Sequence, residues 1–314
     1  MIKIYNTNIE TNEFSEINEF KKGSWINLVN PSQQEINEVC EKLKIQEDFI
    51  KYSLDEEEKS RIEIEEDDNT IFIIVDVPVK IIENQEEIHS TMPLGMIVVR
   101  DDFFITVSLK KDPMIEEFEK GKHPITYKKT RTILQVFYKN AEAYLKELKI
   151  IDKEKDVAEK ALKNSMKNKE LLKMLSLEKS LVYITTSLKS NELVMEKVMR
   201  GKIIKIYDDD DDLLEDAIIE NKQAMEMAKI YSDILSGTMD AYASIISNNL
   251  NIVMKVLTSI TIILSVPTII GSFWGMNVDV PLQDTPFGFY IVMGIAICIS
   301  IIFLFWFKKK DMLS

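Results

Sequence analysis

The sequence predicts an α/β domain at the N-terminus, then long α-helices, and finally two membrane-spanning helices. Strand-like apolar runs are confined to residues 1-126, and helical periodicity without strand signals follows them. No charged residue occurs from Val256 to Trp274 or from Phe287 to Phe307. Each run approaches the roughly 20 residues with which a helix crosses a hydrocarbon core. We therefore expect two C-terminal spans.

Residues 1-126 alternate between strand and helix signals, as a layered α/β domain does. The predicted strands are Met1–Tyr5, Trp25–Val29, Arg61–Glu65, Thr70–Val79, and a hairpin of Met96–Arg100 with Phe103–Leu109 around Asp101-Asp102. The predicted helices run from Asn30-Pro31-Ser32 to about Leu43 and from Asp48 to Glu57. Proline is tolerated near the first position of a helix, which supports the first of them.

Residues 127-207 predict two long antiparallel helices. Apolar residues recur with helical spacing from Thr130 to about Ser165 and again from Leu171 to Val198. Breaks occur at Asn164–Asn168 and at Gly201–Asp212. These helices precede the segment that leads into the first span.

Residues 208-274 predict a stalk helix that continues into the first span, at about 256-274. From Leu213 the pattern is helical, and apart from Gly237 it meets no glycine or proline before Pro267. A helix of about 60 residues is about 90 Å long. Movement of its soluble end could therefore reach the membrane end.

The remaining segments are an outer loop, the second span and a basic tail. Their predicted bounds are 275-286, 287-307 and 308-314. Basic residues flank the spans at Lys255 and at Lys308, Lys309 and Lys310, whereas the loop has no Lys or Arg. Because basic residues favour the cytoplasmic side, we expect both termini in the cytoplasm of a multi-pass protein of the inner (plasma) membrane.

Polar residues form one line along the first span and the stalk. They recur at helical spacing and comprise Asp240, Ser244, Ser247, Asn251, Thr258, Thr261, Ser265, Thr268 and Ser272, and the thioether of Met254 lies in the same line. The line fits the axis of a water-filled pore, with either Leu257 or Thr258 facing it. The alternative is a helix-packing seam whose hydroxyls bond to their own helix. The second span has few polar residues and suits a lipid-facing position.

Composition excludes several classes of function. The net charge of -13 opposes nucleic-acid binding. Cys40 and Cys298 lie in unrelated contexts, and His89 and His123 cannot make a cage of several histidines in one chain. The sequence has no phosphate-binding glycine loop and no catalytic set at recognisable spacing. We therefore expect no enzyme and no organic cofactor.

One motif carries a family resemblance. Trp274-Gly275-Met276-Asn277 ends the first of two C-terminal spans, and a short acidic loop, a second span and a lysine run follow it. This arrangement resembles the CorA family of magnesium channels, with Trp274 in place of the family's usual tyrosine. The resemblance implies a funnel-shaped homopentamer in which the first span lines a pore and the second forms an outer ring. It also implies a ring of Asn277 that receives hydrated Mg²⁺, and a basic ring from Lys308–Lys310.

The resemblance also implies regulation by Mg²⁺. Asp240 matches a family aspartate that faces the cytoplasmic pore, and Asp216 matches one at a regulatory site between subunits. The partner segment departs from the family, with Lys51-Tyr52 where an acidic pair is usual, so Asp55 and Glu56 become the candidate partners of Asp216. The alternative is that Asp216 is only a solvent-exposed charge.

The acidic run Asp208–Asp212 has two interpretations. It could bind divalent cations or lie against the basic ring, or it could be a solvated loop that caps the next helix. The second is favoured, because consecutive aspartates point in different directions.

The resulting hypothesis is Mg²⁺ influx driven by the membrane potential and gated by cytoplasmic Mg²⁺, so that Mg²⁺ is both cargo and regulator. The expected partners are further copies of the chain, lipid and divalent cations. Two alternatives remain. One is a transporter of Zn²⁺, Co²⁺ or Ni²⁺ with the same architecture, and the other is a membrane-tethered sensor or scaffold without a pore.

Overall fold

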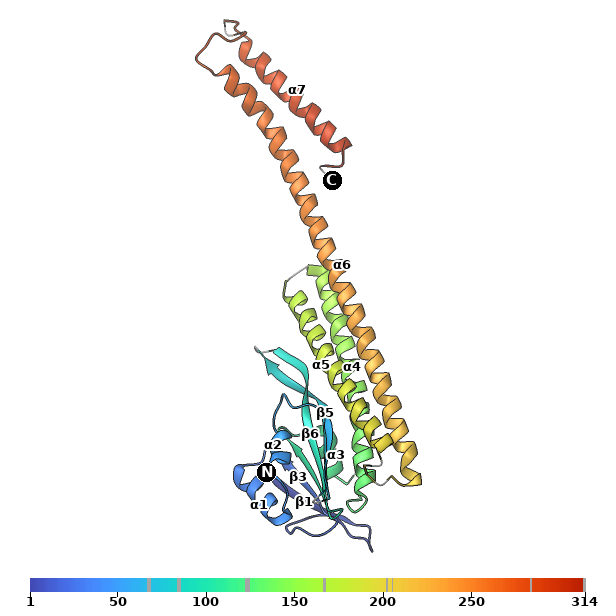
Figure 1. Cartoon of the computed structure of the whole chain (residues 1–314). Coiled ribbons are helices and arrows are strands. Elements are labelled where there is room, and N and C mark those ends of the chain that lie inside the picture. The colour runs from blue at the N-terminus through green and yellow to red at the C-terminus, as the bar shows by residue number, and fades with distance from the viewer. Residues whose placement is uncertain are drawn as a thin grey trace. The chain divides into compact units, whose positions relative to one another are not determined.

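The computed structural model of the chain describes residues 1–66, 69–83, 86–121, 125–165, 168–201, 203–204, 206–282 and 284–312. The chain divides into two compact units, Met1–Ser236 and Gly237–Ser314. The division falls inside one helix, α6 (Asp208–Trp274), which contributes to both units (Figure 1). His123 lies outside the described residues.

The first unit is built on a seven-stranded mixed sheet. The strand order is β2-β1-β3-β7-β6-β5-β4. The strands are β1 (Ile2–Thr7), β2 (Phe14–Ile17), β3 (Trp25–Val29), β4 (Arg61–Glu65), β5 (Thr70–Glu83), β6 (Glu86–Val99) and β7 (Phe103–Ser108). Among the strand pairs of the described residues, β3–β7 is parallel and every other neighbouring pair is antiparallel. The fold is therefore the α/β layer domain that the sequence predicts.

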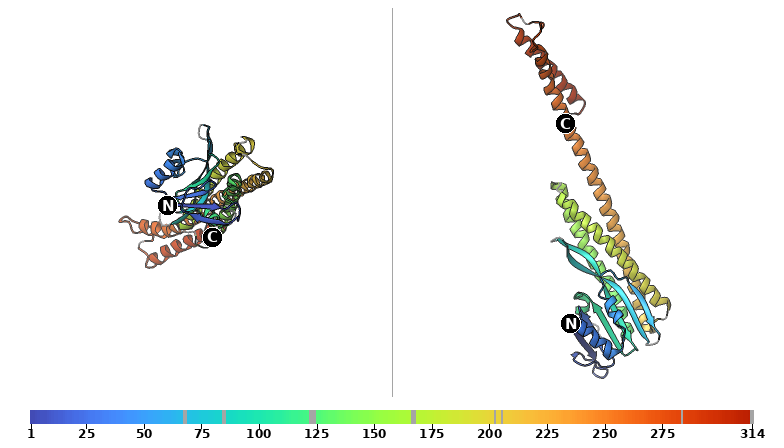
Figure 2. Two further views of the ribbon diagram at one scale, coloured as in Figure 1. Left: turned by 90° about the horizontal axis from the view of Figure 1, so that it is seen from below. Right: turned by 60° about the vertical axis from the view of Figure 1, so that its left-hand side comes forward.

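Helices cover both faces of the sheet (Figures 1 and 2). Helices α1 (Gln33–Leu43) and α2 (Glu47–Tyr52) pack on one face, and α3 (Pro113–Glu119), α4 (Lys129–Ser165) and α5 (Asn168–Gly201) pack on the other. Strand β5 alternates accordingly, because Phe72 and Ile74 belong to the core beneath α1 and α2, whereas Ile73 and Val75 belong to the core beneath α4 and α5. The start of α6 joins the second core through Leu214 and Ala217.

A side-chain amide replaces a missing sheet bond where α5 meets β5. On the side of β4, the pairing with β5 ends where Arg61 lies opposite Ile74, so the backbone of Asp76 lies beyond the end of that ladder. Asn191, which is fully buried on α5, accepts from the Asp76 N–H and donates to the Asp76 carbonyl, both at 2.8 Å. Asn140 and Tyr144 of α4 donate to the same carbonyl at 2.8 and 3.0 Å. These bonds attach both helices to the centre of the sheet.

The second predicted helix ends earlier than its expected end at Glu57. Helix α2 ends at Tyr52, and turns follow at 53–54 and 56–57. The Asp55 side chain accepts the N–H of Glu57, which offers the backbone an alternative to helical bonds. Ser53 is buried against Gly95 of β6, where an added Cβ would stand 1.8 Å from the Ser53 Oγ atom. The chain therefore turns at Ser53.

Other predicted boundaries also move. Strand β5 extends beyond Val79 to Glu83, and β6 begins at Glu86 rather than Met96, so the two pair over fourteen positions. The sequence reading missed β2 and α3. Helix α6 begins at Asp208, so the acidic run forms its first turn instead of preceding it. Carboxylates are stabilised there by the helix dipole.

The second unit contains the last part of α6 and the helix α7 (Gly288–Lys309). Within the described residues, two helices are long and apolar enough to cross a membrane, and these are α6 and α7. Pro267 lies inside α6 without ending it. The predicted spans thus correspond to continuous helices.

Candidate ion-conducting surface

One face of α6 is covered by the chain around α7. Ser259 is fully buried, and its hydroxyl donates to the Lys255 carbonyl at 2.8 Å and lies 3.2 Å from the carbonyl of Met312, beyond the end of α7. Further along α6, Ile263 and Ile270 continue this face at helical spacing and are half-buried. This face identifies the opposite side of α6 as the free one within the unit.

The predicted hydroxyl line lies on that free side. An α-helix turns about 100° per residue, so Thr261 stands about 200° around α6 from Ser259. Thr258, Thr261, Thr268 and Ser272 are exposed, and Ser265 is half-exposed. Thr261, Ser265 and Thr268 line a shallow groove together with Leu264 and Ile269. The structure therefore brings the line together on one face, away from α7.

Three of these hydroxyls donate their hydrogens to their own helix. Thr261 bonds to the Leu257 carbonyl at 2.8 Å, Ser265 to the Thr261 carbonyl at 2.8 Å, and Thr268 to the Leu264 carbonyl at 3.1 Å. A hydroxyl whose hydrogen is used in this way keeps its lone pairs for an acceptor role. The face thus presents oxygen acceptors along the groove.

The line continues toward the N-terminus of α6. Asp240, Asn251 and Met254 are exposed and follow the same helical spacing. Leu257 and Thr258 are both exposed and lie on either side of the centre of the line. Both therefore remain candidates for the pore-facing position.

The Gly275-Met276-Asn277 motif forms the turn that ends α6. The Gly275 N–H donates to the Gly271 carbonyl at 2.9 Å, and a Cβ on Gly275 would approach that oxygen to 3.1 Å. The Trp274 indole N–H donates to the Pro281 carbonyl at 3.2 Å, which holds the loop against the helix end. Met276 and Asn277 are exposed. The amide of Asn277 is thus presented at the end of α6.

The candidate regulatory residues do not assemble a metal site within one chain. Asp216 is exposed on α6, while Asp55 and Glu56 lie in the turn after α2. Glu56 is 3.7 Å from the ammonium of Lys110. In the part of the chain that the structure describes, no three His, Cys, Asp or Glu side chains are grouped to hold a metal. A site between subunits that includes Asp216 stays a prediction.

The basic residues lie at the C-terminal end of α7. Lys308 and Lys309 occupy its last turn and Lys310 is its C-cap, and all three are exposed. Positive charge at this end is favoured by the helix dipole. The arrangement suits contact with lipid phosphate or with acidic side chains.

A polar cluster around the buried His89 was not expected from the sequence. His89 of β6 is 1% exposed, with Nδ1 against the carboxylate of Glu147 and Nε2 3.3 Å from that of Glu154, both on α4. Lys173 of α5 binds Glu154 at 2.8 Å. Strands β5 and β6 extend together beside these helices, and only that tertiary arrangement brings the four side chains together. The cluster joins β6 to α4 and α5.

Comparison with known proteins gives a consistent result. The family described as "CorA-like Mg2+ transporter protein" matches residues 20–309. The cobalt/magnesium transport protein CorA of Methanocaldococcus jannaschii is 28% identical over 296 residues, which cover 91% of this chain and 90% of that protein. The magnesium transport protein CorA of Campylobacter jejuni is 25% identical over 307 residues, covering 92% and 91%.

A solved structure is similar over nearly the whole chain. The complete structure of the CorA magnesium transporter from Methanocaldococcus jannaschii superposes with a TM-score of 0.84 at 25% identity, covering 98% of each chain. The family match at residues 20–309 includes both apolar helices, and the structural similarity covers nearly the whole chain. This chain is therefore an integral membrane protein of the CorA family of transporters.

Proposed function

We propose that this protein is a homopentameric channel for Mg²⁺ influx. The observation that carries the proposal is the line of oxygen acceptors on α6, which faces away from α7 and leads to Asn277. Five such lines around one axis would enclose a polar path, with α7 outside it. The relatives named as cobalt/magnesium and magnesium transport proteins support this class of ion.

The chemistry of the line suits a hydrated cation. Mg²⁺ gives up its water reluctantly and prefers oxygen partners. The waters around it direct their hydrogens outward, so a wall of hydroxyl and amide oxygens can accept from them without stripping the ion. A ring of Asn277 would receive the hydrated ion at the outer mouth. The membrane potential supplies about 2.3 kcal/mol per charge per 100 mV, and about twice that for a divalent ion, so no nucleotide is required.

Gating would depend on cytoplasmic Mg²⁺ between subunits. Carboxylates such as Asp216, Asp55 and Glu56 repel one another when they face across an interface, and bound Mg²⁺ neutralises them. Loss of the ion would loosen the subunits and open the path. Asp216 and the hydroxyl line belong to the same helix, α6, which gives a direct mechanical connection. With both termini in the cytoplasm, Asp216 would sense the internal ion.

The first test is Mg²⁺ uptake into proteoliposomes at fixed membrane potential. We expect the intact protein to conduct and the Asn277→Ala variant to lose uptake or its preference for Mg²⁺. Asn249→Ala is the matched control, because Asn249 lies on α6 two residues, and so about 200°, from Asn251 of the line. If the protein is inserted and oligomeric but carries Zn²⁺, Co²⁺ or Ni²⁺ and not Mg²⁺, then Mg²⁺ is the wrong cargo. If the protein carries none of these four ions, the result would favour the membrane-tethered sensor or scaffold.

A second test addresses gating separately. Asp216→Asn should leave Mg²⁺ influx intact but weaken its shut-off by internal Mg²⁺. Asp233→Asn, at another exposed position of α6, is the charge-matched control. Normal shut-off in Asp216→Asn would remove Asp216 from the mechanism.

A further inference from the structure

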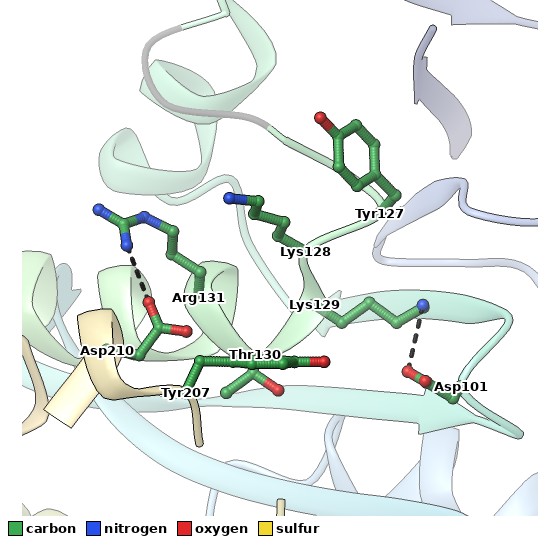
Figure 3. Close-up of a pocket in the computed structure, with 8 residues that line it drawn as sticks. All are labelled: Asp101, Tyr127, Lys128, Lys129, Thr130, Arg131, Tyr207 and Asp210. Carbon is green, nitrogen blue, oxygen red and sulfur yellow. Dashed lines mark hydrogen bonds and ion pairs between the residues drawn. The ribbon is translucent and has the colours of Figure 1, made fainter. Parts of the chain in front are cut away.

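A basic cavity lies at the start of α4 in the first unit (Figure 3). Its volume is about 410 Å³, within the range of small-molecule sites. The residues that matter for the argument are Tyr127, Lys128, Lys129, Arg131, Tyr207 and Asp210. Three cationic side chains in four positions are notable in a chain with a net charge of -13.

Two of the three cations are already paired. Lys129 is only 8% exposed, and its ammonium lies 3.2 Å from the carboxylate of Asp101. The guanidinium of Arg131 donates to the buried carboxylate of Asp210 at 2.8 Å, which fixes its direction. Among ion pairs between residues that the structure describes, none includes Lys128. The cavity therefore carries a surplus positive charge.

The side chains of Lys128 and Arg131 lie on the same side of the start of α4. Lys128 directly precedes α4, and Arg131 lies in its first turn. In Figure 3 both extend to one side, whereas Lys129 extends to the other, toward Asp101. Two cations so placed repel each other, and Asp210 compensates only one of them. An anion between them would remove the repulsion.

The backbone at this point also favours an anion. The first amides of an α-helix have no partner within the helix, and its dipole is positive there. Helix α4 has no acidic residue in its first turn that could take this place. The Thr130 hydroxyl also lines the cavity and can donate a hydrogen bond. The side chains and the backbone that line the cavity thus all favour an anionic ligand.

We propose that this cavity binds the phosphate group of a small soluble phosphorylated compound. The phosphate lies between Lys128 and Arg131 and against the first amides of α4. Tyr127 and Tyr207, which also line the cavity, offer aromatic surface to the rest of the ligand. The site is independent of Mg²⁺ conduction, and its ligand would bind whether or not the proposed channel conducts.

Binding to the full-length protein in detergent tests the proposal. Titration calorimetry at constant ionic strength would use adenosine monophosphate, inorganic phosphate and adenosine as probes. We expect both phosphate compounds to bind and adenosine not to bind. Lys128→Ala should weaken phosphate binding about tenfold or more, because a bond to a charged group is lost. Lys149→Ala is the matched control, at an exposed lysine on the same helix.

The outcomes separate the sources of the phosphate. Tighter binding of adenosine monophosphate than of phosphate, lost in Tyr207→Ala, would identify a nucleotide, and equal binding would identify phosphate itself. The proposal is overturned if neither phosphate compound binds, if adenosine binds equally well, or if Lys149→Ala weakens binding as much as Lys128→Ala. Lys128→Gln provides a second variant should the alanine variant fold poorly.

Discussion

The amide of Asn191 offers a sharp test of how the helices are attached to the sheet. Asn191 accepts from the Asp76 N–H at 2.8 Å and from the Ser60 hydroxyl at 3.0 Å, and it donates to the Asp76 carbonyl at 2.8 Å. Asn191→Leu keeps the branching and the number of heavy atoms of the side chain, although its methyl groups occupy more volume, and it removes all three bonds. The Asp76 carbonyl still accepts from Asn140 and Tyr144, so it stays satisfied.

The cost therefore falls on the Asp76 N–H. A buried donor without a partner costs about 1–3 kcal/mol. The free energy of local unfolding around β5 should fall by the same amount, about 1–3 kcal/mol. Amide hydrogen exchange at Asp76 should therefore accelerate about 5- to 150-fold. Tyr144→Phe should leave this exchange nearly unchanged, because the Tyr144 hydroxyl bonds to the carbonyl and the carbonyl keeps two donors.

Hydrogen–deuterium exchange of the full-length protein in detergent, read by mass spectrometry on peptides of β5, measures this directly. Lys189→Ala, at an exposed position on α5, is the control for general loosening of the helix. Exchange at the wild-type rate in Asn191→Leu would refute the reasoning. So would equal acceleration in Tyr144→Phe, since the effect would then not depend on the N–H.

Three further predictions follow from single buried groups. Burial raises the pKa of Asp112, the N-cap of α3, from 3.8 to about 6. Because the folded state holds that proton more tightly, Asp112 should contribute a fall in stability of about 3 kcal/mol as pH rises from below 4 to above 6. Asp112→Asn keeps an acceptor for the cap, so urea midpoints should lose this part of the pH dependence, and an unchanged slope would contradict the assignment. Gly95→Ala should destabilise the first unit by about 1–3 kcal/mol, because the added Cβ would overlap the side chain of Ser53. Thermal unfolding tests this prediction. Recovery of stability in a Gly95→Ala/Ser53→Gly double variant would identify the clash as the cause. Ser259→Ala should lower the free energy of unfolding by about 1 kcal/mol and lower the melting temperature in detergent, because the buried hydroxyl of Ser259 bonds to the Lys255 carbonyl and faces Met312. Thr261→Val, on the exposed side of α6, is the control. Equal losses of stability in the two variants would argue against a special role for Ser259.

Local patterns in the sequence predicted the main elements and the candidate surface. Strands Trp25–Val29 and Arg61–Glu65 match the observed bounds, because each is a short apolar or alternating run between turn residues. The two uncharged runs correspond to helices, and the three-and-four spacing of Thr261, Ser265 and Thr268 places them on one face whatever else surrounds α6. The family was evident from Gly275-Met276-Asn277 and its position.

Other features depend on which distant segments meet. The first half of β6 was missed because Ser90, Thr91 and Pro93 interrupt any apolar run there. Pairing with β5 stabilises that half of the strand. The end of α2 was misplaced because Ser53 packs against Gly95, forty-two positions later.

The sequence by itself therefore determined the order of most elements, the two spans and the polar face of α6, since periodicity and hydropathy are local properties. Only the tertiary structure decided which face of α6 is covered, how Asn191 bonds to the backbone of Asp76, and where Lys128 and Arg131 share a cavity with Tyr207. Each of these arrangements joins residues that are far apart in the chain, and their bonds are satisfied only after packing has brought them together.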